Sequence, residues 1–261
     1  ASSTQYSGDD IATIDYPAAV AKVREVTGRD SVQMVVHCFG STTFFMAMLA
    51  GLNGVRSAVC SQIATNIVAP VMTKLKTGLH LPDFLDKLGI KSLTAQAEIH
   101  EGWLQKLYDK ALELYPIGDI CNNPVCHRIT FMYAPLYRHE NLNEATHEAQ
   151  YELFGLASMR AFEHLGMMTR KGKLVDFNGN DVYLPHLDRL AIPLCFIHGA
   201  ENQCYLPQST EMTYDLLRKT NNPALYTRHV VPSYGHIDCI YGKNAAADIY
   251  PLMLKHLEQT A

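Results

Sequence analysis

The segment from Val32 to Thr43, VQMVVHCFGSTT, constrains the fold more than any other part of the chain. Apart from Gln33, the residues before His37 are apolar and mostly β-branched, which is typical of a parallel strand covered on both faces. The apolar run stops at His37-Cys38-Phe39-Gly40, and small residues that suit the start of a helix follow. The segment therefore predicts a buried strand that turns sharply into a helix.

Cys38 stands at the apex of this predicted turn. A strand-to-helix turn of this kind is a nucleophile elbow, here with cysteine where serine is usual. Gly40 is expected to remove a side chain that would collide with the neighbouring strand. Backbone N–H groups at the start of the helix, that of Phe39 among them, are expected to lower the pKa of the thiol and to hold an oxyanion.

Other interpretations of the segment stay open. A cysteine after an apolar run is often an ordinary core residue, and Val36 occupies a position where the elbow motif usually has glycine. His37 is expected to be structural. Ser41 is a rival nucleophile, but it lies three residues beyond the apex and would point along the helix.

The composition excludes several classes of protein. With 261 residues, 48% hydrophobic content and 22 basic against 26 acidic residues, the chain is expected to form one globular domain with a lid. It has no basic surplus for nucleic acid. No apolar run reaches the roughly 20 residues that a membrane span needs, and the polar N-terminus lacks a signal-peptide core.

The seven cysteines are an odd number, and several lie in apolar, strand-like contexts. Free thiols in a reducing compartment, the cytoplasm, are therefore expected. Cys121 and Cys126 lie beside His127 with a spacing that suggests a metal, but no second pair of ligands with matching spacing follows. No metal site and no cofactor are expected.

Strands and helices alternate at the start of the chain. Tyr16 to Gly28 is predicted to be a helix, with Pro17 in its first turn and Gly28 as its stop. After the elbow strand, a helix from Thr42 to Ala50 and a buried strand from Val55 to Ile63 are predicted. Such βαβ units form parallel sheets.

The pattern changes from about residue 64 to residue 190. Helical periodicity runs through Leu75–Leu88, Leu93–Leu114 and Glu144–Leu165, and Asn178-Gly179 has the chemistry of a hairpin turn. An insertion of this size between two sheet strands predicts a cap. The expected division is therefore core at 1–63, cap at 64–190 and core again at 191–261.

The alternation then resumes. The predicted elements are a strand over Ile192–His198, a helix over Thr210–Arg218, a strand over Tyr226–Val231 and a closing helix over Ala245–Leu257. Polar groups follow the strand ends, which is where an open parallel sheet places its active site.

Four segments carry a family resemblance: VVHCFGSTTF, CHRITFMYAPLYRHENLN, FIHGAENQCYLPQST and YGHIDCIYGKNAAADIYPLMLKHLE. They resemble the cysteine-type domain of the α/β-hydrolase superfamily that bacteria carry fused behind cholesterol-oxidase-like (GMC) flavin oxidoreductases, or as a separate protein. The resemblance covers almost the whole chain and implies the C-terminal portion of an α/β-hydrolase fold with a large helical cap.

The resemblance implies that His236, in the loop after the last strand, is the base that takes the proton of the nucleophile. The acid position of the family holds Asn202, and an amide oxygen can orient the histidine beside a cysteine nucleophile. Glu201 and Asp238 are rival orienting groups. His198 is expected to pack beneath the site.

The elbow strand begins near residue 31, whereas α/β-hydrolases normally have four strands and an oxyanion loop before it. A sheet of about four strands would also leave the edge of the elbow strand unpaired. A companion polypeptide that supplies the missing strands, or an obligate oligomer, is therefore expected.

The expected function is that of a cysteine-dependent acyl hydrolase of esterase, lipase or thioesterase type, acting through Cys38, His236, Asn202 and the N–H of Phe39. Acyl transfer is a variant of this chemistry. Tyr133 and Tyr137 in the cap suggest an apolar acyl or ester substrate. The alternative is a non-catalytic hydrolase-like module that binds a hydrophobic ligand or docks an oxidoreductase.

Overall fold

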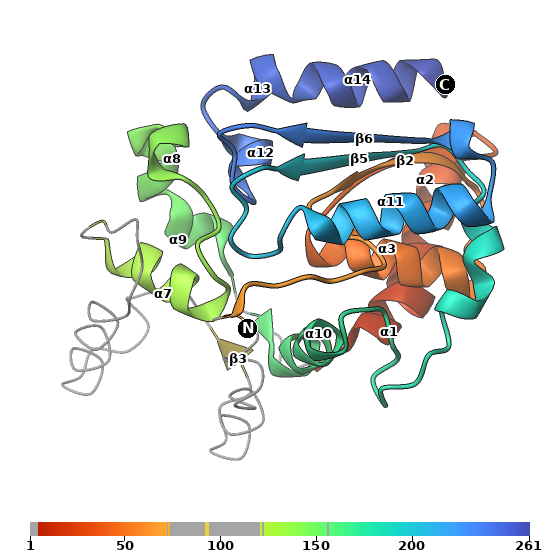
Figure 1. The fold of residues 1–261 in the computed structure, drawn as a ribbon, viewed down its shortest axis with the longest axis horizontal. Coiled ribbons are helices and arrows are strands. Elements are labelled where there is room, and N and C mark those ends of the chain that lie inside the picture. Colours follow the sequence, from red (N-terminus) through yellow and green to blue (C-terminus); the bar gives the residue numbers. More distant parts are fainter. Residues whose placement is uncertain (1–4, 72, 74–91, 94–120, 122, 156) are drawn as a thin grey trace.

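A computed structural model describes residues 5–71, 73, 92–93, 121, 123–155 and 157–261. Its centre is a four-stranded sheet in the order β1-β2-β5-β6, in which neighbouring strands run parallel (Figure 1). The strands are β1 (Val32–His37), β2 (Val55–Ser61), β5 (Leu194–Gly199) and β6 (Tyr226–Val231). The predicted parallel sheet is confirmed.

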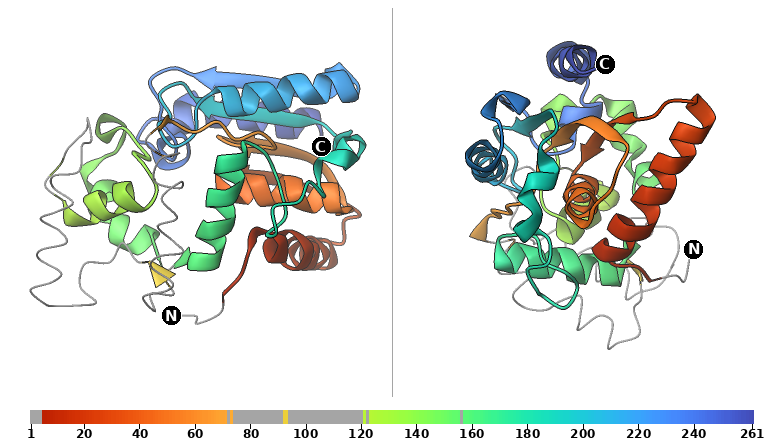
Figure 2. Two further views of the ribbon diagram at one scale, coloured as in Figure 1. Left: turned by 60° about the horizontal axis from the view of Figure 1, so that its bottom comes forward. Right: turned by 90° about the vertical axis from the view of Figure 1, so that its right-hand side faces the viewer.

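Helices cover both faces of the sheet. Figures 1 and 2 show α14 (Tyr250–Gln259) on one face and α3 (Phe39–Ala50) and α11 (Gln208–Thr220) on the other. α2 (Tyr16–Thr27) precedes β1 and ends at Gly28, whose φ of 65° is the left-handed conformation that glycine adopts readily.

Successive residues of the central strands enter two separate cores. Leu194 and Phe196 of β5 pack on the side of α3, whereas Cys195 and Ile197 pack on the side of α14. This period of two, with apolar residues on both faces, explains why β5 appears in the sequence as a continuous apolar run. Residues 41 to 49 of α3 are all buried, so this helix lies inside the domain.

The described elements of the segment between β2 and β5 are α7 (Pro124–Met132), the 3-10 helix η2 (His139–Asn141), α8 (Glu144–Glu148), α9 (Gln150–Leu153), α10 (Met159–Lys171) and the 3-10 helix η3 (Leu184–Leu190). Of these, α7, α8 and α9 lie beside the carboxyl ends of the strands, whereas the chain after α10 returns toward the start of β5 (Figure 1). A short antiparallel pair joins β3 (Ser92–Leu93) to β4 (Ala157–Ser158). We call this segment the cap.

Some predicted boundaries were wrong. The helix after the elbow begins at Phe39, directly after Cys38, because its first turn includes the elbow itself. The periodic stretch from Glu144 to Leu165 is not one helix: α8, α9 and β4 interrupt it before α10 starts with Ser158 as its N-cap.

The closing helix is also broken, at Ile249, between α13 (Ala245–Asp248) and α14. Pro251 in the first turn of α14 explains this break, because proline fits the start of a helix and not its interior. The turn at Asn178-Gly179 is present, with Gly179 at a φ of 83°, but no strand flanks it among the described residues. The predicted helices Leu75–Leu88 and Leu93–Leu114 lie outside the described residues.

Several short elements remain, among them the 3-10 helix η4 (Pro223–Leu225) before β6. A short helix, α1 (Gly8–Asp10), continues through a π-helical segment (Ile11–Asp15) into α2, and α12 (Asp238–Tyr241) follows the loop after β6. No helix among the described residues combines the length and apolar character that a membrane span requires.

Candidate active site

The predicted polar groups meet at one edge of the sheet. Cys38 follows β1, Asn202 follows β5 and His236 follows β6, and the carboxyl ends of parallel strands share an edge. Strand order therefore places three residues that are widely separated in the sequence at the same edge of the sheet.

The backbone at Cys38 has the sharp geometry of an elbow. Its φ of 53° and ψ of −131° are rare for a residue with a side chain, and conformations of this kind cost about 1–3 kcal/mol. The surrounding structure holds the turn in place: Cys38 N donates to Ser61 O at 3.1 Å, and Ser41 N donates to Cys38 O at 2.9 Å. The side chain is partly exposed at the N-terminus of α3.

Gly40 and Ser41 follow Cys38 in the first turn of α3. Gly40 was expected to avoid a collision, and this is wrong, because a methyl group built there meets nothing nearer than the Tyr16 hydroxyl at 3.8 Å. Ser41 is fully buried, and its hydroxyl donates to Ile63 O at 2.6 Å. This hydrogen bond holds the hydroxyl of Ser41, the rival nucleophile, in the core.

Asn202 and His236 form a buried pair. They are 2% and 1% exposed, and Asn202 Nδ2 lies 3.0 Å from His236 Nδ1. The two rivals are placed elsewhere. Glu201 is exposed and pairs with Arg138, whereas Asp238 accepts from Gly235 N at 3.0 Å and from Asn141 Nδ2 at 2.7 Å.

The hydrogen bonds of Asn202 fix the orientation of its amide. Its Oδ1 accepts from the backbone N–H groups of Cys204 at 2.8 Å and Tyr205 at 3.0 Å. Its Nδ2 donates to Gln62 Oε1 at 2.9 Å, and that same oxygen accepts from Gly199 N at 3.0 Å. The amide nitrogen, not the oxygen, therefore faces the histidine.

This orientation sets the tautomer of His236. Because Asn202 Nδ2 donates, His236 Nδ1 must accept, and the ring proton resides on Nε2. The expectation that an amide oxygen orients the ring is wrong for this conformation. His236 Nε2 is buried and has no hydrogen-bond partner among the residues that the structure describes, Cys38 included.

Burial opposes charge on both Cys38 and His236. It raises the pKa of the Cys38 thiol to about 11, although a hydrogen bond from the Phe39 backbone opposes the rise. Burial lowers the pKa of His236 well below its usual value, and the neighbouring His37 and His198 add to this. The N–H groups at the helix start were expected to lower the pKa of the thiol, but desolvation outweighs them.

His37 and His198, both expected to be structural, lie at the ends of β1 and β5. His37 Nδ1 lies 3.1 Å from Ser61 Oγ, and its ring contacts that of His236 edge-on, with 4.8 Å between centroids. His198 is fully buried, and its Nε2 donates to Tyr205 O at 3.0 Å. Desolvation lowers the pKa of each to about 4.

Apolar and aromatic side chains surround the nucleophile position. Cys38, Phe39 and Tyr133 all pack against the larger core, and Tyr133 contacts Phe154 with 5.8 Å between ring centroids. Burial raises the pKa of Tyr133 to about 12, and the nearby Cys38 adds to the rise. Tyr137, the other tyrosine singled out in the sequence, lies deeper in the cap, where its hydroxyl donates to Cys126 Sγ at 3.1 Å.

The loop that carries His236 is held from two sides. Leu136 O, in the cap, accepts from His236 N at 3.0 Å and from Ile237 N at 2.7 Å. On the other side, Gly199 lies so close that a methyl group there would be 1.9 Å from Gly235 O. Glycine is therefore required at residue 199.

Sequence reasoning missed Gln62, which ties Asn202 to the end of β5. A signal was present, because Gln62 is a polar residue directly after a buried strand, at the edge where the site forms. Its φ of 77° could not be inferred from the sequence.

No protein-family model matches the chain. The chain is similar to lipase lipl-3 of Caenorhabditis elegans, with 23% identity over 268 residues that cover 94% of this chain and 63% of the lipase. It is also similar to human lipase member M, with 22% identity, covering 97% of this chain and 60% of that protein. The chain thus spans less than two thirds of the length of either relative.

The solved structures that match are α/β-hydrolases, with esterases and lipases among them. One is a thermophilic esterase from Thermogutta terrifontis, which aligns with a TM-score of 0.51 and 9% identity, over 98% of this chain and 74% of the esterase. The fold of the chain is that of the α/β-hydrolases.

Proposed function

We propose that this chain is an acyl hydrolase of esterase, lipase or thioesterase type in which Cys38 is the nucleophile. The observation that carries the proposal is the elbow geometry of Cys38, at the sheet edge that also holds the buried His236–Asn202 pair. The resemblance to lipases agrees with this chemistry.

In the proposed reaction, Cys38 Sγ attacks the acyl carbonyl and His236 Nε2 takes the thiol proton. The N–H of Phe39 helps to hold the oxyanion. The imidazolium then gives its proton to the leaving oxygen or sulfur as the bond to the acyl carbon breaks. In the second half of the reaction, His236 Nε2 takes a proton from water, which attacks the acyl-thioenzyme. The bond between the acyl carbon and Sγ breaks, the carboxylic acid leaves and His236 returns the proton to the thiolate.

The histidine must change tautomer before it can act as a base. With its proton on Nδ1, His236 loses the hydrogen bond from Asn202 and places two donors face to face. Losing a buried hydrogen bond costs about 1–3 kcal/mol, which corresponds to a rate lower by a factor of about 5 to 150. We therefore expect a slow enzyme.

The substrate class follows from the surroundings of Cys38. Phe39, Tyr133 and Phe154 are partly buried and apolar, and no charged residue of the described chain forms an ion pair with Cys38 or His236. An ester or thioester with an apolar acyl group suits these surroundings.

We also propose that a companion polypeptide or a second copy of the chain covers β1. In the described sheet β1 is an edge strand, and Val35 on it is 52% exposed. Exposed apolar edge strands pair readily with other chains. Size-exclusion chromatography with light scattering tests this: a stable monomer of this chain alone would contradict it.

None of the seven cysteines forms a disulfide in the described chain, which supports a reducing compartment, the cytoplasm, as the place of action. A role beside a flavin oxidoreductase rests on the sequence resemblance alone.

The test of the catalytic proposal is chemical trapping. The purified protein is incubated with p-nitrophenyl butyrate, and intact-mass and peptide analysis locate any acyl group. We expect acylation of Cys38, loss of p-nitrophenol release in Cys38→Ala, and activity close to wild type in Cys195→Ala, whose thiol is buried on the α14 side of the sheet. Equal activity in Cys38→Ala and wild type would disprove the proposal.

A second function is favoured by one specific observation, namely the inward-facing amide nitrogen of Asn202 beside a neutral thiol. A module that binds a hydrophobic ligand without reacting would tolerate this arrangement. In that case no acyl-enzyme forms on Cys38, while the protein still binds an apolar fluorescent probe and Tyr133→Ala weakens that binding.

A further inference from the structure

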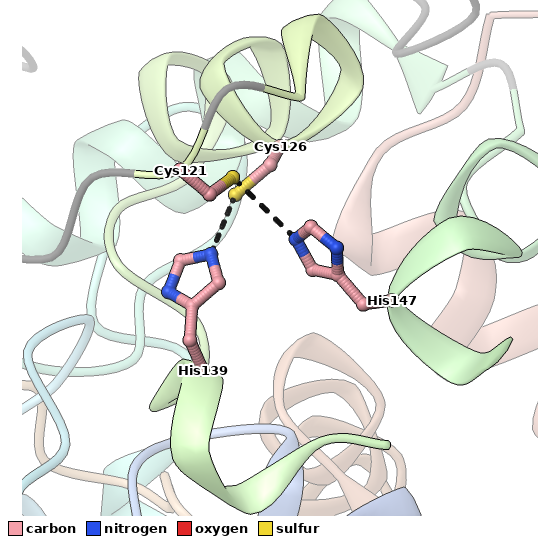
Figure 3. Close-up of side chains that lie close together, drawn as sticks. All are labelled: Cys121, Cys126, His139 and His147. Carbon is pink, nitrogen blue, oxygen red and sulfur yellow. Dashed lines mark hydrogen bonds between the residues drawn. The ribbon is translucent and has the colours of Figure 1, made fainter. Parts of the chain in front are cut away.

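Four sulfur and nitrogen ligands converge in the cap, away from the candidate active site. They belong to Cys121, Cys126, His139 and His147, and the ligand atoms all lie within 4.8 Å of one another. Figure 3 shows both imidazole rings turned toward the two sulfur atoms. Cys126 is buried and the other three side chains are half-buried.

The sequence analysis noted His127 beside the two cysteines but expected no metal site, because no second ligand pair was visible. His127, adjacent to Cys126, directs its Nε2 to the backbone oxygen of Cys121 and is not among the four. The histidines that join the cysteines come from η2 and α8. Their spacing from the cysteines matches no regular motif, so the second ligand pair was invisible in the sequence.

The separations suit a tetrahedral ion. Zinc lies about 2.3 Å from a thiolate sulfur and about 2.0–2.1 Å from a histidine nitrogen, so a regular tetrahedron separates sulfur and nitrogen by about 3.5 Å. The observed separations are 3.3 Å from Cys126 Sγ to His139 Nε2 and 3.5 Å from Cys121 Sγ to His147 Nε2. The other ligand atoms lie up to 4.8 Å apart. If the four side chains moved together by about 1 Å around an ion, these separations would also match those of a zinc tetrahedron.

We propose that Cys121, Cys126, His139 and His147 bind one Zn²⁺ ion. Two thiolates and two imidazoles without a carboxylate are a set that zinc prefers, and calcium and magnesium do not. Both histidines offer the same atom, Nε2, to the centre of the cluster. Four protein ligands close the coordination sphere, so the ion has a structural role.

Neighbouring groups support the ligands. The hydroxyl of Tyr137 donates to Cys126 Sγ at 3.1 Å, and its ring packs edge-on against both His139 and His147. Cys126 also lies in the first turn of the nine-residue helix α7, where the helix dipole favours a thiolate. Contacts of this kind orient metal ligands and tune their affinity.

The proposed site fixes the segment that supports the His236 loop. Three residues before His139, Leu136 O accepts from the backbone of His236 and Ile237. Two residues after it, Asn141 Nδ2 donates to Asp238 Oδ2 at 2.7 Å. A metal that joins α7, η2 and α8 would therefore hold this stretch, residues 136–141, against the core.

The test measures metal content and needs no enzymatic activity, so it is independent of the proposed function. The full chain is produced without a polyhistidine tag, kept reduced, stripped with a chelator and reloaded with Zn²⁺ or Co²⁺. We expect one zinc per chain by elemental analysis. The cobalt form should show the intense visible bands of a tetrahedral ion together with thiolate-to-metal charge transfer.

Variants assign the ligands. Cys121→Ser and His139→Ala should each lower zinc affinity at least tenfold, whereas His127→Ala, which removes a neighbouring histidine outside the set, should retain one zinc. The zinc-loaded wild type should also unfold at a higher temperature than the stripped protein.

Three results would overturn the proposal. One is a reduced wild-type protein that takes up no zinc and gives an octahedral cobalt spectrum. Another is retention of full zinc affinity by Cys121→Ser. The third is a disulfide between Cys121 and Cys126 that persists under reducing conditions. Because the cobalt spectrum uses the wild-type chain, the test holds even if a ligand variant fails to fold.

Discussion

Replacing Asn202 with aspartate should accelerate the proposed reaction. A carboxylate at this position accepts a proton from His236 Nδ1, so that the lone pair of Nε2 faces Cys38 at rest. It removes the tautomer penalty of about 1–3 kcal/mol and stabilises the imidazolium. In the serine hydrolase triad, the reverse change from carboxylate to amide lowers kcat by about 10⁴. We expect Asn202→Asp to raise kcat/KM at least tenfold and at most about 10⁴-fold.

The same substitution has a cost that the structure defines. One carboxylate oxygen keeps the two N–H donors of Cys204 and Tyr205, now as charge-assisted hydrogen bonds. The other oxygen meets Gln62 Oε1, which lies 2.9 Å from the amide nitrogen it replaces. The Gln62 amide can turn to donate, but Gly199 N then loses its acceptor, which destabilises the fold by about 1–3 kcal/mol.

The assay is the pH profile of kcat/KM on p-nitrophenyl butyrate, with circular dichroism and a urea titration to check folding. The carboxylate raises the pKa of His236, so the rising limb of the profile should move to higher pH in Asn202→Asp. Asn202→Ala, which lacks both donor and acceptor, is the control that separates the charge effect from mere removal of the amide. A folded Asn202→Asp protein that is no faster than wild type would refute the tautomer argument.

Three further outcomes are expected. Stability in urea should decline as the pH falls from about 6.5 to about 4. Burial holds the folded-state pKa of His37 and of His198 at about 4, so only the unfolded chain takes up protons on these histidines over this range. The loss is at most about 3 kcal/mol for each histidine, and a stability that is flat over this range contradicts the prediction. Cys38 should react with iodoacetamide with a midpoint near pH 11, and rapid labelling at pH 7 in the absence of substrate would show that the thiol is ionised. Gly199→Ala should lower the unfolding free energy by about 3 kcal/mol or displace the His236 loop, and an unchanged melting temperature together with unchanged activity would contradict the close approach to Gly235.

The central strands β2 and β5 could be predicted because each is an almost continuous run of residues that suits burial on both faces. β6 begins and ends where the sequence predicts, and β1 lies within its predicted run. The association of Asn202 with His236 was implied by the family resemblance. The strand order agrees with it, since loops after parallel strands meet at one edge.

Other features depend on contacts that no local pattern records. The direction of the Asn202 amide is set by backbone N–H groups two and three residues later, and the pKa of Cys38 by the balance between burial and a helix terminus. The breaks among α8, α9 and β4 interrupt a stretch whose apolar spacing alone favours one helix. The four ligands of the proposed zinc site come from segments that only the folded cap brings together.

The double hydrogen bond to Leu136 O has a consequence for protein engineering. One way to change the substrate range of a hydrolase with a lid is cap exchange, in which the insertion of one protein is grafted onto the core of another. Here a graft that replaces the whole insertion would also remove the carbonyl that positions the backbone of His236. A chimera should therefore retain residues 136–141 with the recipient core and take only the remaining insertion from the donor.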